Sequence, residues 1–149
     1  MKIRISVSEE NRRSVTSFMH EHGIETGDDA DYILTESDRF PAFLSVRNDK
    51  KEHVRLSIGE VTFIEAFGKD IEIHTDEGVF LSQDRMYQLE ELLDPQAFLR
   101  VSRSVIVAKR HIKKIRPSLS MKFILTLTDG TLIDVTRSYY SDFKRFFNI

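Results

Sequence analysis

The stretch Phe98-Leu99-Arg100-Val101-Ser102-Arg103-Ser104-Val105-Ile106-Val107 carries two arginines and two serines directly before three β-branched residues. The β-branched residues predict a short strand at 104–107. A helix is expected just upstream, at about 85–93, with Asp84 as its N-terminal cap and Asp94-Pro95 as its stop. The cationic stretch therefore lies between a helix and a strand.

Many further short strands, separated by polar turns, are predicted on both sides of this stretch. The clearest hairpin is Leu127-Thr128-Asp129-Gly130-Thr131-Leu132, because an Asp-Gly pair accepts the positive φ angles of a type I′ turn. A last helix is expected at about 139–147, behind Ser138. This pattern is typical of an antiparallel β domain. The other candidate strands are 43–47, 53–57, 61–66, 70–75, 79–81, 122–128 and 131–136.

The beginning of the chain predicts a small βαβ unit instead. Ile3, Ile5 and Val7 alternate with polar residues, as in a strand with one buried face, and a second strand is expected at 32–34. Ser8 is expected to cap the helix between them and Gly23 to end it. The predicted buried face of that helix consists of Val15, Phe18, Met19 and His22.

The predicted domain boundary is the segment 37–42, which contains Pro41. It separates an N-terminal extension, residues 1–38, from a β domain, residues 43–149. Parallel strands are normally covered on both faces, so a βαβ unit this small should pack on something else. We therefore expect the extension to serve in dimerisation or regulation.

Composition excludes several classes of protein. The chain has 149 residues, of which 40% are hydrophobic and 31% charged, and it contains no cysteine. Disulfide scaffolds and thiolate metal sites are thereby excluded. No apolar run approaches the roughly 18 residues of a membrane span, and the start lacks the apolar block of a signal peptide. We expect a cytoplasmic protein.

Charge is distributed unevenly along the chain. Residues 1–94 contain 11 Lys/Arg and 21 Asp/Glu, whereas residues 95–149 contain 11 Lys/Arg and 3 Asp/Glu. Such asymmetry indicates a surface for a polyanion, or equally a solvated basic face that pairs with the acidic half. The segment between Asp94 and Asp129 has no acidic residue and contains Arg100, Arg103, Lys109, Arg110, Lys113, Lys114, Arg116 and Lys122.

Motifs for catalysis or cofactor binding are missing from the sequence. His20 and His22 would point to different faces of a helix, and His53, His74 and His111 lack the spacing of a metal motif. The glycine-containing turns lack the spacing of phosphate-binding loops. We therefore expect no catalytic, cofactor or metal site, no small-molecule substrate and no enzymatic activity.

Four ordered segments resemble the LytTR-type DNA-binding domain of bacterial transcription regulators. They are Val61-Thr62-Phe63-Ile64-Glu65-Ala66 with Gly68-Lys69, Leu89-Glu90-Glu91-Leu92, the stretch Phe98 to Val107, and Asp134-Val135-Thr136-Arg137-Ser138. The resemblance covers about residues 43–149. It implies a mainly β fold: an elongated antiparallel β sandwich of small sheets with two short helices.

The resemblance also implies which residues contact double-stranded DNA. In this family, loops enter successive major grooves, and we expect this protein to bind as a homodimer on repeated sites. Arginine can bond guanine O6 and N7 together, so Arg137 is the expected base reader. Arg100 and Arg110 are added from the basic segment. The predicted DNA-binding residues are Gly68, Lys69, Arg100, Ser102, Arg103, Ser104, Arg110, Thr136, Arg137 and Ser138.

Two departures from the family pattern suggest a shifted sequence preference. Ser102 stands where the family often has His, and Ala108 where it commonly has Asn. The short extension resembles that of stand-alone family members, whose control comes from partners, sometimes a membrane protein. Glu36 falls where a receiver domain, the usual phosphorylated partner of this domain, would have its acceptor Asp, so control by phosphorylation is not expected.

Two other functions remain open for the sequence. A protein-interaction module could dock its basic half on an acidic partner or an anionic surface. RNA binding has less support, because Phe63, Phe67, Phe80 and Phe98 fall at positions expected in a core rather than on a base-stacking platform.

Overall fold

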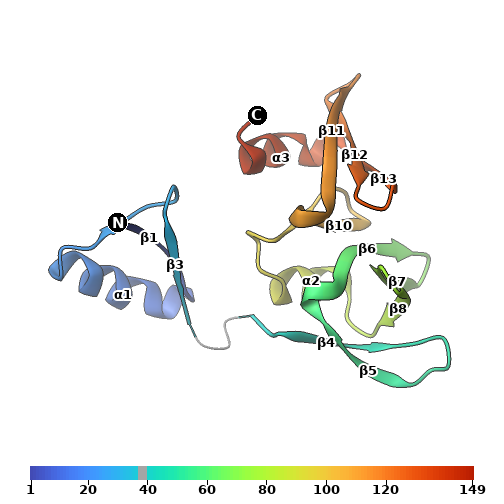
Figure 1. Ribbon diagram of the computed structural model, residues 1–149, viewed down its shortest axis with the longest axis horizontal. Coiled ribbons are helices and arrows are strands. Elements are labelled where there is room, and N and C mark those ends of the chain that lie inside the picture. Colours follow the sequence, from blue (N-terminus) through green and yellow to red (C-terminus); the bar gives the residue numbers. More distant parts are fainter. Residues whose placement is uncertain (37–39) are drawn as a thin grey trace. The chain divides into compact units, whose positions relative to one another are not determined.

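The chain forms two compact units, Met1–Phe40 and Pro41–Ile149, in a computed structural model that describes residues 1–36 and 40–149 (Figure 1). The first half of the predicted boundary, residues 37–39, lies outside the described residues. Within the described ranges, no helix is long and apolar enough to cross a membrane.

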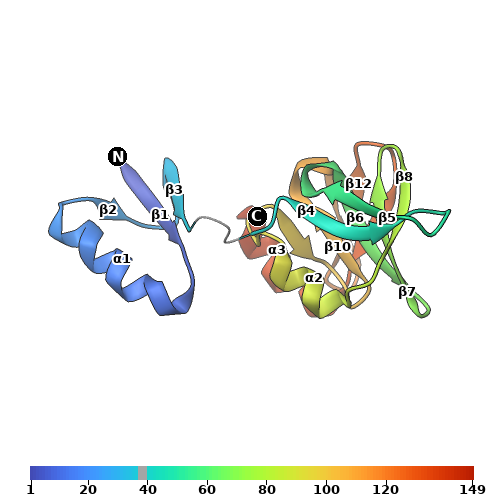
Figure 2. The same cartoon turned by 90° about the horizontal axis from the view of Figure 1, so that it is seen from below.

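The N-terminal unit is a three-stranded parallel sheet with one helix. Its elements are β1 (Lys2–Ser6), α1 (Glu9–Glu21), β2 (Glu25–Thr26) and β3 (Tyr32–Thr35), and the strand order is β2-β1-β3. Helix α1 lies along one face of this sheet (Figure 2), where Ile5, Val7 and Met19 form a small core. The additional strand, β2, was not predicted, since its two residues are polar and exposed.

Two predictions for helix α1 are wrong. Phe18 is 54% exposed and its ring stacks on that of the exposed His22, with 4.1 Å between centroids, so neither belongs to the buried face. The Ser8 side chain accepts no capping bond. Instead Glu36 Oε1 accepts hydrogen bonds from the Ser8 N–H and hydroxyl, each 2.8 Å, and from Asn11 Nδ2, 2.9 Å. A carboxylate is favoured there by the positive end of the helix dipole.

The second unit contains two antiparallel sheets and two short helices, which confirms the predicted mainly β fold. One sheet has seven strands in the order β5-β4-β8-β7-β6-β10-β9, and the other has the order β11-β12-β13. The helices are α2 (Met86–Leu92) and α3 (Tyr140–Phe147). The strands are β4 (Phe43–Arg47), β5 (His53–Ser57), β6 (Val61–Phe67), β7 (Asp70–Thr75), β8 (Gly78–Ser82), β9 (Phe98–Arg100), β10 (Val105–Ala108), β11 (Ile112–Ser118), β12 (Lys122–Leu127) and β13 (Leu132–Val135).

Two hydrophobic cores lie on opposite faces of the seven-stranded sheet. Side chains alternate along a strand, so Ile64 of β6 packs in the core with Leu89 of α2, whereas the neighbouring Phe63 packs in the core with β12, β13 and α3. Phe143 of α3 is fully buried in this second core. Figure 1 shows β10 between the strands β6–β8 and the sheet β11–β13. Strand β10 therefore belongs to the layer between the two cores.

Two local predictions in this unit are also wrong. Helix α2 begins one residue later than predicted, and its N-terminal cap is Arg85 rather than Asp84. The Gln88 side chain accepts a hydrogen bond from the Arg85 N–H at 2.8 Å. The β12–β13 hairpin has positive φ at Gly130 alone among its turn residues, 91°. The Leu127 carbonyl accepts from Gly130 and the Leu127 N–H donates to Thr131, which makes a three-residue loop with a glycine bulge rather than a type I′ turn.

Candidate nucleic-acid interface

Val101 joins two of the three predicted DNA-binding loops. Its N–H donates to the Val105 carbonyl at 3.0 Å and closes the turn 102–104 between β9 and β10. Its carbonyl accepts the N–H of Thr136 at 3.0 Å, directly after β13. Because Val101 is fully buried, these bonds are shielded from water. The turn 102–104 and the segment 136–138 are therefore held side by side.

The third predicted loop lies beside the same turn. The Ala66 N–H donates to the Ser104 carbonyl at 2.8 Å, and the pair Phe67 and Asp70 closes the turn that contains Gly68 and Lys69. Gly68 has a φ of 61°, a left-handed conformation that glycine adopts without strain. The three loops thus gather where β6 and β13 end and β10 begins.

Three cations of these loops are exposed and unpaired. Lys69, Arg103 and Arg137 are exposed, and across the described parts of the chain their side chains form no hydrogen bond or ion pair. Thr136 is partly buried and Ser138 is exposed in the short 3-10 helix Arg137–Tyr139 that precedes α3. Free guanidinium groups at loop tips can bond phosphate or guanine without first breaking an internal bond.

Arg100 and Ser102 serve the turn itself. Arg100 donates from Nε to the Ser102 carbonyl at 3.1 Å and from Nη2 to the Arg103 carbonyl, and its Nη1 pairs with Glu90 of α2 at 2.9 Å. Ser102 is 8% exposed, and its Oγ lies 3.3 Å from the backbone nitrogen and from the hydroxyl oxygen of Ser104. This geometry favours a positioning role for Arg100 and Ser102.

Arg110 is not brought together with the other predicted residues. It follows the end of β10, whereas the turn 102–104 precedes the start of that strand, and four residues of strand span about 13 Å. Arg110 lines a hollow of about 260 Å³ with the acidic residues Glu60, Asp76 and Glu77. An acidic surrounding disfavours phosphate there.

Two arginines that sequence reasoning missed lie beside Lys69. Arg47 of β4 and Arg85 line a polar hollow of about 300 Å³ with Lys69, and Asp70 and Asp84 also face it. The Arg47 Nε is buried and forms no hydrogen bond within the described residues. The exposed and unpaired Lys69 gives the hollow a free donor for a phosphate oxygen. In the sequence these cations are scattered over almost forty positions, so only strand pairing reveals the group.

Acidic side chains lie at the same end of the two sheets. A groove of about 470 Å³ is lined by Ser102, Ser104 and Thr136 together with Glu65 and Asp134. Hydroxyls suit phosphate oxygens, whereas carboxylates repel them and accept from cytosine N4. Phe67, expected in the core, is 70% exposed next to Gly68. It is one exposed ring rather than a platform.

The sequence matches one family over most of the second unit. A family profile described as LytTr DNA-binding domain matches residues 51–148. The "Transcriptional regulatory protein LytR" of Staphylococcus aureus (strain N315) is 30% identical over 108 residues, which are 72% of this chain and 44% of that protein. The "Sensory transduction protein LytT" of Bacillus anthracis is 25% identical over 96 residues, 64% of this chain and 39% of that protein.

A solved structure has the same fold. It is described as the LytTr DNA-binding domain of a putative methyl-accepting/DNA response regulator from Bacillus cereus, and it matches with a TM-score of 0.69 and 25% identity over 73% of this chain and 99% of that chain. The chain spans less than half the length of the curated relatives that it matches. The family profile, the relatives and the shared fold agree: this chain belongs to the LytTr DNA-binding domain family.

Proposed function

We propose that this chain is a transcriptional regulator that binds double-stranded DNA in a sequence-specific manner. The observation that carries the proposal is the gathering of three loops at one end of the two sheets, with Lys69, Arg103 and Arg137 exposed and unpaired. Loops with free cations can enter major grooves, and the sheets behind them keep their spacing fixed.

The residues take different roles in this proposal. Arg137 reads a base edge, because its guanidinium is free at the tip of a segment that Val101 holds in place. Lys69 and Arg103, with the hydroxyls of Ser104, Thr136 and Ser138, bind phosphates or bases. Arg47 and Arg85 add phosphate contacts beside Lys69. Arg100 and Ser102 position the turn, and Arg110 lies outside the interface.

The protein acts as a homodimer on repeated DNA sites in this proposal, with residues 1–38 as the dimerisation unit. Helix α1 covers one face of the parallel sheet. Ile33 of β3, which pairs in register with Arg4 of β1, is 55% exposed. Tyr32 and Phe18 are also more than half exposed. Parallel sheets are normally covered on both faces, so a second copy would complete this one.

The proposal is tested by fluorescence anisotropy with the DNA upstream of the gene and a scrambled duplex of the same composition, at several salt concentrations. We expect the native fragment to bind about a hundredfold or more tighter. Both duplexes should show strong salt dependence, since each phosphate contact contributes about −0.9 to the slope of log affinity against log salt. Equal binding of the two duplexes would count against the proposal. If a genome-wide binding selection then yields no preferred sequence, the basic surface serves another partner.

A further inference from the structure

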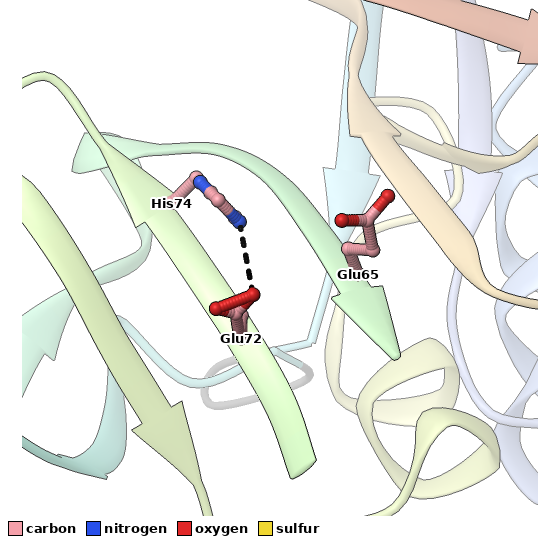
Figure 3. A group of neighbouring side chains, drawn as sticks. All are labelled: Glu65, Glu72 and His74. Atoms are coloured by element: carbon pink, nitrogen blue, oxygen red, sulfur yellow. Dashed lines mark ion pairs between the residues drawn. The ribbon is translucent and has the colours of Figure 1, made fainter. Parts of the chain in front are cut away.

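One histidine and two glutamates form a cluster on the sheet face that β6 and β7 share (Figure 3). Glu65 of β6 pairs in register with Glu72 of β7, and Phe63 pairs with His74. Residues two apart on a strand lie on the same face, so all three side chains project to one side. One nitrogen or oxygen from each lies within 4.8 Å of the other two.

The imidazole of His74 has an unused nitrogen. Its Nε2 is buried and forms no hydrogen bond in the part of the chain that is described. Nε2 points toward Glu72, whose Oε1 is 4.0 Å away, too far for a hydrogen bond. The Phe63 ring stacks on the imidazole at 4.0 Å and 12° and fixes its plane. A buried polar atom without a partner is unfavourable, so a bound ligand would stabilise it.

Among the described residues, the two carboxylates have a single ion pair, that of Glu72 with His74 at 4.0 Å. Like charges directly opposite each other on neighbouring strands are destabilising. Among the described residues, no lysine or arginine forms an ion pair with Glu65 or Glu72. An ion bound between these carboxylates would remove the repulsion and satisfy His74 Nε2 together.

We infer that Glu65, Glu72 and His74 bind one divalent transition-metal ion, for which Zn²⁺ is the probe. Imidazole nitrogen and carboxylate oxygen are both zinc ligands, with bonds of about 2.0–2.2 Å, and three protein ligands leave a fourth position for water. Tetrahedral ligands at that bond length lie about 3.3 Å apart. The glutamate side chains, which are partly exposed, must therefore rotate inward when the ion binds.

The ion site borders the candidate nucleic-acid interface. Glu65 lines the groove that also contains Ser102, Ser104 and Thr136. Binding Zn²⁺ would neutralise negative charge beside the loops that approach phosphates. Resting on the proposed function, this predicts that Zn²⁺ tightens DNA binding, whereas binding of the ion itself is independent of DNA.

Calorimetric titration of the full chain with zinc chloride, near pH 7 in a buffer that does not chelate, tests the site. We expect one ion per chain. Glu72→Gln and His74→Gln should each weaken binding about tenfold or more, because each removes a ligand. His53→Gln, an exposed histidine of β5 outside the cluster, is the matched control and should bind as the parent does. Glu72→Gln keeps the side-chain shape and guards against loss of folding.

The absence of one-to-one binding overturns the inference. Binding that survives Glu72→Gln and His74→Gln but is lost in His53→Gln also overturns it, because the ion then sits at the surface. A second readout is DNA affinity with and without Zn²⁺. Tighter DNA binding that is lost in Glu72→Gln supports the coupling. One-to-one binding with unchanged DNA affinity keeps the ion site and overturns the coupling alone, whatever the outcome for DNA recognition.

Discussion

At the scale of single residues, the partly buried Arg100 holds the 102–104 turn in shape. It donates to the Ser102 and Arg103 carbonyls and pairs with Glu90. We expect Arg100→Gln to lower the free energy of unfolding by about 1–3 kcal/mol, because carbonyls and a carboxylate lose their donor. Arg103→Gln should change it by less than about 0.5 kcal/mol, since that side chain is exposed and unpaired.

Thermal denaturation of both variants checks this assignment. The reverse order of stabilities, or equal effects, would contradict it. DNA titrations add a second readout, because Arg103→Gln removes a DNA contact whereas Arg100→Gln disturbs the geometry of the turn. Arg100→Lys should restore part of the stability while Arg103→Lys is neutral.

Arg47 is the residue for which strand pairing predicts a role that the sequence does not. We expect Arg47→Gln to weaken binding to native and scrambled duplexes alike and to reduce the salt slope by about 0.9, since it removes one phosphate contact. Arg55→Gln is the matched control, because the Arg55 guanidinium lies over the Phe43 ring, 4.3 Å from its centroid. An unchanged salt slope in Arg47→Gln would remove Arg47 from the interface.

At the scale of elements, the ionised form of Asp129 adds a small stabilisation to the β12–β13 hairpin. Its carboxylate accepts the Thr131 N–H at 2.9 Å, and this bond lowers the pKa of Asp129 below its ordinary value of 3.8. The folded pKa is depressed, so the stabilisation is present above the unfolded pKa and is lost as pH falls through the folded pKa. Because the group is exposed, the effect is small.

Asp129→Asn provides the measurement for this hairpin. The amide oxygen can still accept the Thr131 N–H, but it does not titrate in the acid range. We therefore expect the free energy of unfolding of the variant to fall less steeply than that of the parent below about pH 4. Parallel curves for the two proteins between pH 5 and pH 2 would show that Asp129 is not linked to stability.

Most strands of the second unit were predictable from the sequence, and β6, β8, β10, β12 and β13 differ from the predicted bounds by one residue at one or both ends. Strands β4, β5 and β7 have the predicted bounds. Strand β11 was missed because a register shift between Ile112 and Lys114 breaks the period of two. Strand β9 is only three residues long. Length and irregularity, rather than composition, hid these elements.

The candidate site was predictable to the level of loops but not of side chains. The resemblance indicated the turns at Gly68, Ser102 and Arg137, and the hydrogen bonds of Val101 bring two of them together. The distance of Arg110 and the Glu65–Glu72–His74 cluster depend on strand register. Register is a tertiary property, since the partner strand is far along the chain.

At the scale of the whole molecule, we expect the two units to have separate functions, dimerisation in the first and DNA recognition in the second. Residues 41–149 have two hydrophobic cores of their own, so we expect this fragment to fold alone and to keep its preference for the native duplex. Sedimentation equilibrium should give a dimer for the full chain and a monomer for the fragment. A full chain that stays monomeric at micromolar concentration, free and on DNA, would contradict dimerisation through residues 1–38.

The central claim is that loop side chains read bases, and Arg137→Ala tests it most directly in the anisotropy titration with native and scrambled duplexes. We expect a loss of about tenfold or more in affinity for the native duplex, with scrambled binding and the salt slope nearly unchanged, because one bidentate contact to guanine is removed. Arg145→Ala, an exposed arginine of α3, is the control and should keep the parent's preference. If Arg137→Ala weakens both duplexes equally or leaves the preference intact, base reading by Arg137 is contradicted.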